Sequence, residues 1–518
     1  MELVKKQIHS NQMGKKIVDQ FYVDDDFNVP DNKLDVARIV LSDGKIRVDD
    51  MKQVDNYLRV TGKLYFQILY VSDEGEPKLL SLDGTMPFEE MVYAEDTGAG
   101  YYVRHTRVEL TAMIVHNRKL NLKAMIELEV TMEGIRDEQA TVDVESEQQI
   151  YKKMNPKNIM QMHTNKKDTY RIKEEMSIPG TKENIGELLW TDVSGRKLDT
   201  KLGRDEMQIR GELLVFCFYQ SQEEKLDWVE LSVPYEGRVD CMGVDESMYH
   251  HANSVLDDVN VEIRMDEDGE MRALGIEGTL EMRIAIYEEE RVDLLQDIYS
   301  LEQQCNLETR EATYEELVMQ NHSKCKVSEQ LSLPELKEDI LQICHSSGVL
   351  QIDQTEPVED GIMIEGVLHI SFLYVKADDQ IPFDTWQGMV PFSYLLECKE
   401  IAADMVYDIT NAVEQLSVTL LGSDEVEVKA VLAFHSFLRR RIHADVITDI
   451  HFEPYSVEEM ERRPGIVGYI VKEGDDLWSL AKKYCTTVES IAEVNELPEE
   501  NVKVGDRILI FKENMSIL

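Results

Sequence analysis

The side chains most able to bind a metal ion are a histidine pair, His250 and His251, and two acidic runs at residues 24–26 and 288–290. Imidazole and carboxylate groups are common metal ligands, but a site needs several of them at a suitable spacing. No third ligand follows the histidine pair at a recognisable interval, and the acidic runs lack the alternating oxygens of a calcium loop. We therefore expect no metal site, a solvated turn at the histidine pair, and solvated acidic runs.

The chain lacks the motifs on which common catalytic sites are built. It contains no H-E-x-x-H, no phosphate-binding P-loop, no G-x-S-x-G and no G-x-G-x-x-G. We therefore expect a protein that is not an enzyme and that uses no cofactor.

The charge of the chain limits the class of partner. There are 101 acidic and 55 basic residues, which gives a formal net charge of −46. Such a surface repels phosphate backbones and anionic lipids, so we expect no direct binding to nucleic acid or to a membrane surface. It suits a partner with basic patches, although solubility alone also explains the charge.

Length and cysteine content indicate the size class and the compartment. A chain of 518 residues holds three or four domains. No stretch approaches the roughly 18–20 consecutive apolar residues that cross a bilayer, so we expect no transmembrane segment. The first residues show no apolar run of signal-peptide length, and the seven cysteines form no C-x-x-C pair. We expect a cytosolic protein without a disulfide framework.

Three landmarks recur along the chain in the same order. They are a segment that ends in proline (23–30, 172–179, 327–334), a strand-like block that contains a glycine (60–70, 209–219, 364–374) and a tag around a second proline (86–90, 233–237, 390–394). The first prolines and the glycines are both separated by 149 and 155 residues, and the tag prolines by 147 and 157. This common register predicts one domain in three copies.

The composition of each copy favours β structure. The blocks LYFQILY, LLVFCFY and LHISFLY are dense in aromatic and β-branched residues, and the preceding glycine predicts a bulge or a close backbone approach. We expect a mainly β protein with three tandem, sandwich-like repeat domains at 16–140, 166–289 and 323–441. The polar segments 141–165, 290–322 and 442–465 lack strand alternation, so we expect linkers there, with a short helix at 294–304.

The last part of the chain predicts a small module of two strands and two helices. Four apolar residues in DDLWSLAKKY (Leu477, Leu480, Ala481 and Tyr484) form one stripe of an amphipathic helix, which Asp475 or Asp476 can cap. Thr486 and Glu489 fit a capping box at the start of a second helix. Residues 506–511 return as the second strand.

This module, which we place at residues 466–513, resembles a LysM domain. The resemblance rests on GDDLW (474–478), Asn495, VGD (504–506) and ILI (508–510). It implies a strand–helix–helix–strand fold and binding of N-acetylglucosamine-containing polymers between two loops. Trp478 either stacks on a sugar or packs inside. The candidate partner- or glycan-binding residues are Glu473, Gly474, Asp475, Asp476, Leu477, Trp478, Asn495, Glu496, Leu497, Pro498 and Glu499.

The three repeats resemble the SPOCS domain, and three such domains followed by one LysM domain is the layout of SipL-type spore-coat morphogenetic proteins. The resemblance implies a mother-cell protein that docks on the forespore surface and works there with the coat-basement ATPase. Repeat 2 departs from the pattern in having Tyr235 where the tags of the other copies have phenylalanine.

Two classes of function follow from these observations. The first is a non-enzymatic adaptor that assembles the spore coat. The second is a peptidoglycan-binding LysM protein or the hub of a phage-like tail. The missing export signal weakens the wall-binding alternative, and the three SPOCS-like copies weaken the tail alternative.

Overall fold

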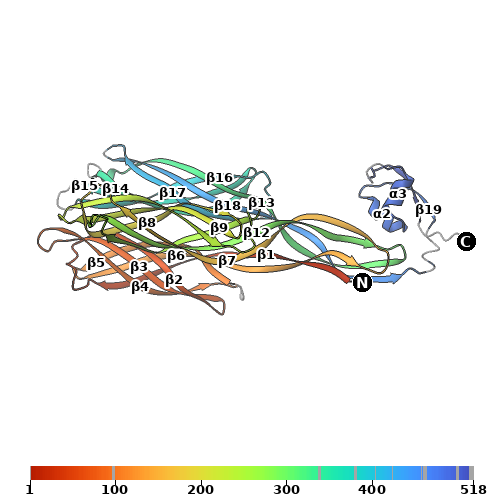
Figure 1. Ribbon diagram of the computed structural model, residues 1–518, viewed down its shortest axis with the longest axis horizontal. Coiled ribbons are helices and arrows are strands. Elements are labelled where there is room, and N and C mark those ends of the chain that lie inside the picture. Colours follow the sequence, from red (N-terminus) through yellow and green to blue (C-terminus); the bar gives the residue numbers. More distant parts are fainter. Residues whose placement is uncertain are drawn as a thin grey trace.

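The computed structural model of the chain describes residues 2–95, 100–336, 340–377, 382–402, 404–422, 424–456, 458, 464–497 and 501–512. The molecule is elongated (Figure 1). A wide region of β-sheets, which we call the head, lies at one end, long paired strands extend from it, and the C-terminal module lies at the other end. No helix within the described ranges is long and apolar enough to cross a bilayer.

The three repeats have the same order of strands, and the first and last strand of each repeat are the longest. Repeat 1 contains β1 (Glu2–Asn28), β2 (Arg38–Val54), β3 (Tyr57–Ser72), β4 (Lys78–Tyr93), β5 (Gly100–His116) and β6 (Lys119–Glu145). Repeat 2 contains β7 (Tyr151–Ser177), β8 (Ile185–Leu202), β9 (Glu206–Ser221), β10 (Leu226–Asp240), β11 (Tyr249–Arg264) and β12 (Ala273–Tyr299). Repeat 3 contains β13 (Gln303–Ser332), the short 3₁₀ helix η1 (Pro334–Leu336), β14 (Ile340–Val358), β15 (Gly361–Lys376), β16 (Phe383–Glu397), β17 (Met405–Leu420) and β18 (Glu425–Pro454).

Each repeat is a pair of antiparallel three-stranded sheets. The sheet orders are β1-β6-β5 and β2-β3-β4 in repeat 1, and the corresponding strands of repeats 2 and 3 follow the same orders. The two sheets of a repeat enclose one apolar core, which in repeat 1 includes Leu64, Phe66 and Ile68 of β3 and Leu122 and Ile126 of β6. The prediction of three sandwich-like β domains is confirmed.

The long strands continue beyond the sandwiches as two-stranded ribbons, which together we call the stalk. The ribbons are residues 2–12 with 134–145, 151–161 with 288–299, and 303–315 with 441–454. Apolar side chains of all three ribbons meet in shared clusters, for example Ala140, Leu294 and Val446. Polar contacts also join them: Thr141 Oγ1 donates to the Ile447 carbonyl at 2.6 Å. The ribbons therefore support one another.

The stalk corrects our prediction for the segments between the repeats. Residues 141–165, 290–322 and the first part of 442–465 are mostly strand. The helix that we predicted at 294–304 is absent, because β12 ends and β13 begins there. Each ribbon has one inward face, but a register shift changes which positions lie on it: Cys305 and Leu307 contact the neighbouring ribbons before the shift between Glu308 and Thr309, and Ala312 and Tyr314 after it. The alternation along the sequence is therefore interrupted. The domain boundaries given above stay a prediction.

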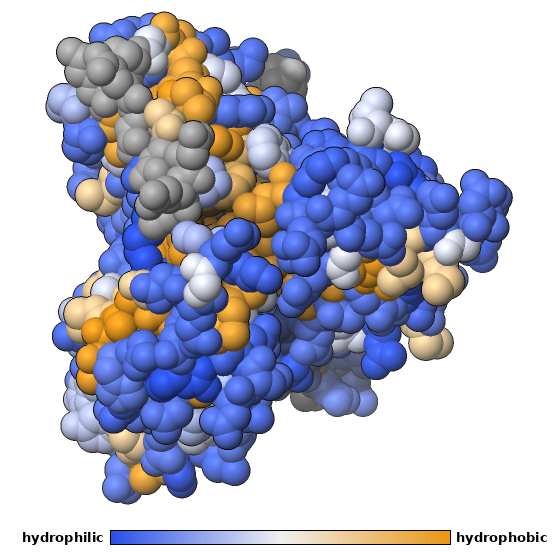
Figure 2. All heavy atoms as spheres, turned by 90° about the vertical axis from the view of Figure 1, so that its left-hand side faces the viewer, coloured by the Kyte–Doolittle hydropathy of each residue, from blue (hydrophilic) through white to orange (hydrophobic). Residues whose placement is uncertain are grey.

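The three repeats also meet at the far end of the head. Leu69, Phe218 and Leu373, from the central strands β3, β9 and β15, lie in one apolar cluster. Figure 2 faces this end and shows three lobes with hydrophobic side chains gathered between them. The ends of the central strands therefore bury one face in their own core and the other between repeats. This explains why LYFQILY and LLVFCFY lack strict alternation.

The glycine landmark and the proline tag are cross-strand neighbours. In repeat 1, Gly62 on β3 pairs with Phe88 on β4 and lies opposite the irregularity between Val48 and Asp50 on β2. Repeats 2 and 3 have the same arrangement around Gly211 and Gly366. A Cβ on the glycine would meet the neighbouring aromatic ring in all three repeats. The glycine is needed because this ring and the bulged strand approach it closely, as predicted.

The prolines of the tag lie on the outer edge strands β4, β10 and β16. Proline has no N–H to donate to a neighbouring strand, so it is tolerated at an edge. The same property removes one donor that another chain could use to pair along that edge. In the tag, the aromatic ring therefore packs over the glycine, and the proline makes the sheet edge less able to pair with another strand.

Substitution of the landmark glycines tests this packing. A Cβ at Gly62 or Gly366 would meet a backbone carbonyl, whereas at Gly211 the nearest atoms belong to the side chain of Tyr235. We expect Gly62→Ala and Gly366→Ala each to lower the free energy of unfolding by about 1–3 kcal/mol, and Gly211→Ala to lower it less. The control is Gly195→Ala, where nothing lies within 4 Å. Equal unfolding curves for all four variants would contradict the packing argument.

Histidines gather between repeats 2 and 3. The rings of His322 and His435 stack with centroids 4.1 Å apart, and His250 Nε2 lies 2.8 Å from the Thr200 hydroxyl. Burial lowers the pKa of His250, His251 and His435 to about 4, because the charged imidazole loses its hydration. The solvated turn predicted for the histidine pair is therefore wrong: both residues lie on β11 and are half-buried.

The lowered pKa values of His250, His251 and His435 predict a loss of stability in mild acid. Their pKa is lower in the folded chain than in the unfolded chain, so the unfolded chain binds more protons between about pH 6.5 and pH 4. Stability that is present above pH 6.5 should therefore fall as the pH decreases through this window. Thermal unfolding of the wild type and of His251→Gln/His435→Gln should show a smaller fall for the variant.

The matched control for this experiment is His443→Gln/His451→Gln, which changes two exposed histidines. It should behave as the wild type does. If the half-buried and exposed double variants lose the same stability between about pH 7 and pH 5, the histidine cluster does not set the acid response.

Candidate functional site

The C-terminal module has the predicted strand–helix–helix–strand order. β19 (Ile466–Ile470) pairs with β20 (Arg507–Phe511), and α2 (Leu477–Tyr484) and α3 (Val488–Val494) lie between them in the sequence. Three residues of the predicted stripe, Leu477, Leu480 and Ala481, are buried, and they share one cluster with Ile491 of α3. The helix pair is therefore held by the stripe that the sequence indicated.

The predicted N-cap of the first helix is correct, and that of the second helix is not. Asp476 is the N-cap of α2, and its side chain and that of Ser479 form a reciprocal capping box. Asp475 instead accepts bonds from the Lys472 amide at 2.8 Å and the Tyr469 hydroxyl at 2.9 Å. The capping box predicted for Thr486 is wrong by one residue, because Thr487 caps α3 through the Ser490 amide.

The candidate binding residues fall into three groups. Glu473, Gly474 and Glu496 are exposed, and Asp475, Asp476, Trp478, Asn495 and Leu497 are half-buried. Leu477 is buried, and Leu497 packs against the same cluster, which brings the two predicted loops to one core. Asn495 is structural, since its amide bonds the Leu509 backbone. Pro498 and Glu499 lie outside the described residues.

The stalk contacts the first helix of the module. Asp297, at the end of β12, accepts the Trp478 indole N–H at 2.8 Å and the Lys482 ammonium at 2.6 Å. Lys153 lies opposite Asp297 on β7 and donates to the Asp476 carboxylate at 2.7 Å. Four charges of alternating sign therefore join stalk and module.

Tyr299 adds an apolar part to this contact. It is only 3% exposed and belongs to the core cluster of the module. Its ring meets Trp478 edge to face with centroids 4.8 Å apart, and its hydroxyl donates to the Thr486 carbonyl at 3.0 Å. We call the set Lys153, Asp297, Tyr299, Asp476, Trp478 and Lys482 the stalk contact. The Trp478 ring packs against the stalk here, and its part in binding stays a prediction.

The stalk contact was missed by sequence reasoning. Asp297 and Tyr299 lie in a segment that we expected to be a linker, far from the module in the sequence, and nothing in their spacing links them to Trp478. The charge pairing leaves its mark on Asp476: burial raises the pKa of this carboxyl, but the hydrogen bonds from Lys153 and Ser479 outweigh it and lower the pKa to about 2. Asp476 is therefore ionised at neutral pH.

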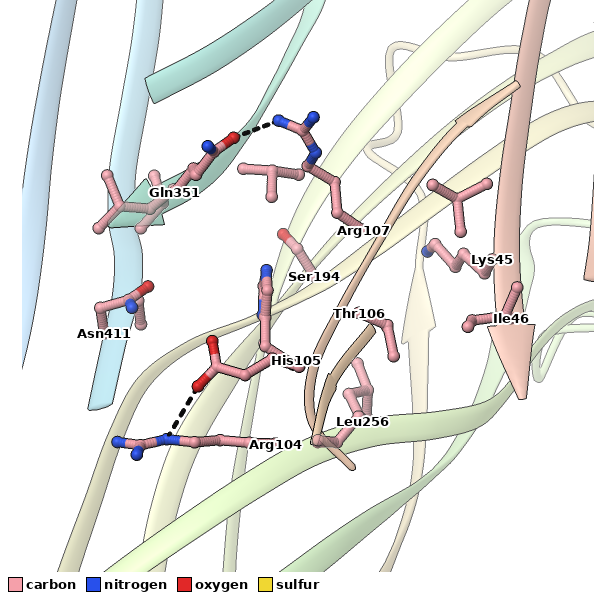
Figure 3. Close-up of a pocket in the computed structure, with 18 of the residues that line it drawn as sticks. Lys45, Ile46, Arg104, His105, Thr106, Arg107, Ser194, Leu256, Gln351 and Asn411 are labelled. Atoms are coloured by element: carbon pink, nitrogen blue, oxygen red, sulfur yellow. Dashed lines mark hydrogen bonds and ion pairs between the residues drawn. The ribbon is translucent and has the colours of Figure 1, made fainter. Parts of the chain in front are cut away.

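A second candidate site is a cavity of about 1720 Å³ between the three repeats. It is lined by edge strands of each repeat, including β2, β5, β8, β11, β14 and β17. Figure 3 shows Lys45, Arg107, Ser194 and Gln351 around it, from all three repeats. The cavity is the space that the three repeats leave between them.

The charges of the cavity join repeats to one another. Its lining has eight Lys or Arg and nine Asp or Glu, so it offers no excess of either sign to a charged ligand. Arg107 donates to the Gln351 side chain (Figure 3), and Asp192 pairs with His345 at 3.0 Å. These contacts cross between repeats. These cross-repeat contacts therefore stabilise the head.

The described part of the chain holds one group of three side chains with metal-ligand spacing. Glu308, Asp449 and His451, on the outside of the stalk, bring ligand atoms within 4.8 Å of one another. All three are exposed, and such groups pair readily without a metal. The seven cysteines, all of them described, form no disulfide.

Comparison with known families gives two matches. The SPOCS-domain model of SipL matches residues 35–117, 184–264 and 339–421, which correspond to the second to fifth strands of each repeat and leave out the long first and last strands. The LysM model matches residues 469–511. No curated protein matches the chain. No solved structure matches it either.

The cap of α2 supplies a prediction for the module. Replacing Asp476 with alanine removes the capping box and the pair with Lys153, so the module should lose about 1 kcal/mol of stability or more. Asp476→Asn keeps a capping acceptor and loses the charge, so it should recover most of this loss. Hydrogen exchange of the α2 amides in the full chain measures both. Equal exchange in the two variants would show that the cap is unimportant.

Proposed function

Because this chain carries three SPOCS domains of the SipL family followed by one LysM domain, we propose that it is a non-enzymatic assembly adaptor of the bacterial spore coat. The two domain types support a sporulation-related role in protein interaction or glycan binding, and both are binding domains rather than catalytic ones. In this proposal the protein works in the mother-cell cytoplasm, at the forespore surface, with the coat-basement ATPase as its partner.

The observation that carries the proposal is the separation of two binding regions along one long body. The LysM domain lies at the end of the stalk, and the three SPOCS domains form the head at the other end (Figure 1). An adaptor needs this arrangement, because one end must contact the basement layer while the other stays accessible to further coat proteins. Loops on a rigid support are where binding residues concentrate.

The charge of the LysM loops indicates the chemistry of the partner. Glu473 and Glu496 are exposed, one in each predicted loop. Exposed carboxylates at the rim of an interface increase the rate of association with a basic surface and orient the partner. A protein partner with a basic patch therefore fits this face.

Glycan binding is the second candidate, and the LysM match itself favours it. In that case N-acetylglucosamine-containing polymers would lie between the loops 473–477 and 495–499. An acidic rim does not exclude an uncharged sugar. The two candidates therefore need a direct comparison on the same variants.

Reversal of the loop charges separates the candidates. We expect Glu473→Lys/Glu496→Lys to weaken binding of the purified coat-basement ATPase at least about tenfold, which corresponds to about 1.4 kcal/mol. The fold should be unaffected, because both side chains are exposed. The control Glu489→Lys/Glu493→Lys makes the same charge change on exposed positions of α3 and should bind as the wild type does.

Binding of the same proteins to purified peptidoglycan completes the test. If the wild type binds peptidoglycan tightly, ignores the ATPase and loses the glycan when the loops are changed, the protein is a glycan-binding LysM protein. The adaptor proposal then fails.

A further inference from the structure

The stalk contact occupies part of the face that we assign to the partner. Two of its residues, Asp476 and Trp478, are also candidate binding residues. Both face the stalk, through Lys153 and Asp297. A partner that used these two side chains would therefore have to displace the stalk. The remaining exposed residues of the same face, such as Glu473 and Glu496, stay accessible.

From this overlap we infer that the stalk tip is a latch, which keeps the first loop and α2 of the LysM domain closed until a partner replaces it. This inference rests on the proposed function, because it concerns the same binding face. It adds that the chain exists in a closed and an open state. Binding to the closed state is limited to the exposed rim.

The latch is held by ion pairs and hydrogen bonds that each join one stalk residue to one LysM residue. The Asp297 carboxylate neutralises Lys482 and accepts the Trp478 N–H, while Lys153 neutralises Asp476. These side chains are half-buried, where a charge-assisted hydrogen bond is stronger than at a fully exposed site. Breaking the contact leaves four charges to be rehydrated and exposes the rings of Tyr299 and Trp478.

The latch also defines what a partner must offer. To replace the stalk, a partner needs an acceptor, such as a carboxylate, for Trp478 and Lys482. It also needs a cation for Asp476 and an apolar or aromatic group for the Trp478 ring. A protein surface with paired opposite charges beside an aromatic residue has this chemistry. A neutral sugar offers acceptors and an apolar face but no cation, so it should compete less well with the stalk.

The energetic consequence is a reduced apparent affinity. When only a fraction of the molecules is open, the apparent dissociation constant increases by the inverse of that fraction. If the latch leaves about a tenth or less of the molecules in the open state, it increases the apparent dissociation constant about tenfold or more. Removal of the latch should increase affinity by the same factor, although it removes side chains that never touch the partner.

The test compares an open variant with a matched control in the full chain. The open variant is Lys153→Ala/Asp297→Ala. The control is Lys157→Ala/Asp293→Ala, which removes the same charges from the same ribbon away from the stalk contact. Carbodiimide forms a zero-length amide between a carboxylate and an amine that touch. In the wild type it should join Lys482 to Asp297 and Lys153 to Asp476.

The same proteins are then titrated with the purified coat-basement ATPase. We expect the open variant to bind at least about tenfold more tightly than the wild type and the control. Saturating ATPase should abolish both cross-links in the wild type. Absence of the cross-links in the free wild-type chain overturns the latch, whatever the ATPase does. Equal affinity of the open variant and the control also overturns it.

A separate arm distinguishes failure of the latch from failure of the proposed function. If the cross-links form and no protein binds the ATPase, the proposed partner is wrong, and the titration is repeated with a pentamer of N-acetylglucosamine. Tighter binding of the pentamer by the open variant then supports the latch on a glycan site. If neither probe binds the open variant, the stalk contact guards no binding face and the inference is wrong.

Discussion

The antiparallel pairing of the first and last strand of each repeat is the interaction on which the whole structure depends. In repeat 1 it extends from Glu2 opposite Glu145 to Asn28 opposite Lys119. Within the head this pairing closes the sandwich, because the last strand is the centre of its sheet. Beyond the head the same pairing forms the ribbons of the stalk, and the end of the second ribbon forms the seat of the LysM domain. The same three strand pairs therefore contribute to the sandwiches, form the stalk and provide the surface that contacts the LysM domain.

Much of the fold of each repeat could be predicted from the sequence, because its landmarks are local and repeated. The glycine and the aromatic residue of the tag recur together in each copy because they are cross-strand partners, as Gly62 and Phe88 show. The helices of the LysM domain also follow from a local stripe and a local cap. In each case the physical cause lies within a few tens of residues.

The rest could not be predicted, because it depends on contacts between copies. The sequence predicts linkers where the stalk lies, because register shifts interrupt the alternation of inward-facing residues along the ribbons. The hydrogen bond between Asp297 and Trp478 could not be predicted for a similar reason. Nothing in the local sequence of either residue indicates the other, and only the tertiary arrangement brings them together. Of the predicted binding residues, Glu473 and Glu496 are exposed in the two predicted loops, whereas Trp478 already contacts Asp297 of the stalk.

The pairing of first and last strands has a consequence for biosynthesis. Ribosomes make about 5–20 residues per second, so β1 waits for about 7–30 s before β6 exists to pair with it. Pairings this distant in sequence form slowly, since the chain must lose much freedom before the contact is made. Because the three repeats resemble one another, a first strand that is still unpaired can join the last strand of another copy, which is a known route to misassembly. Vectorial synthesis reduces this hazard: β6 leaves the ribosome well before β12 and β18, so the correct partner is the first to arrive.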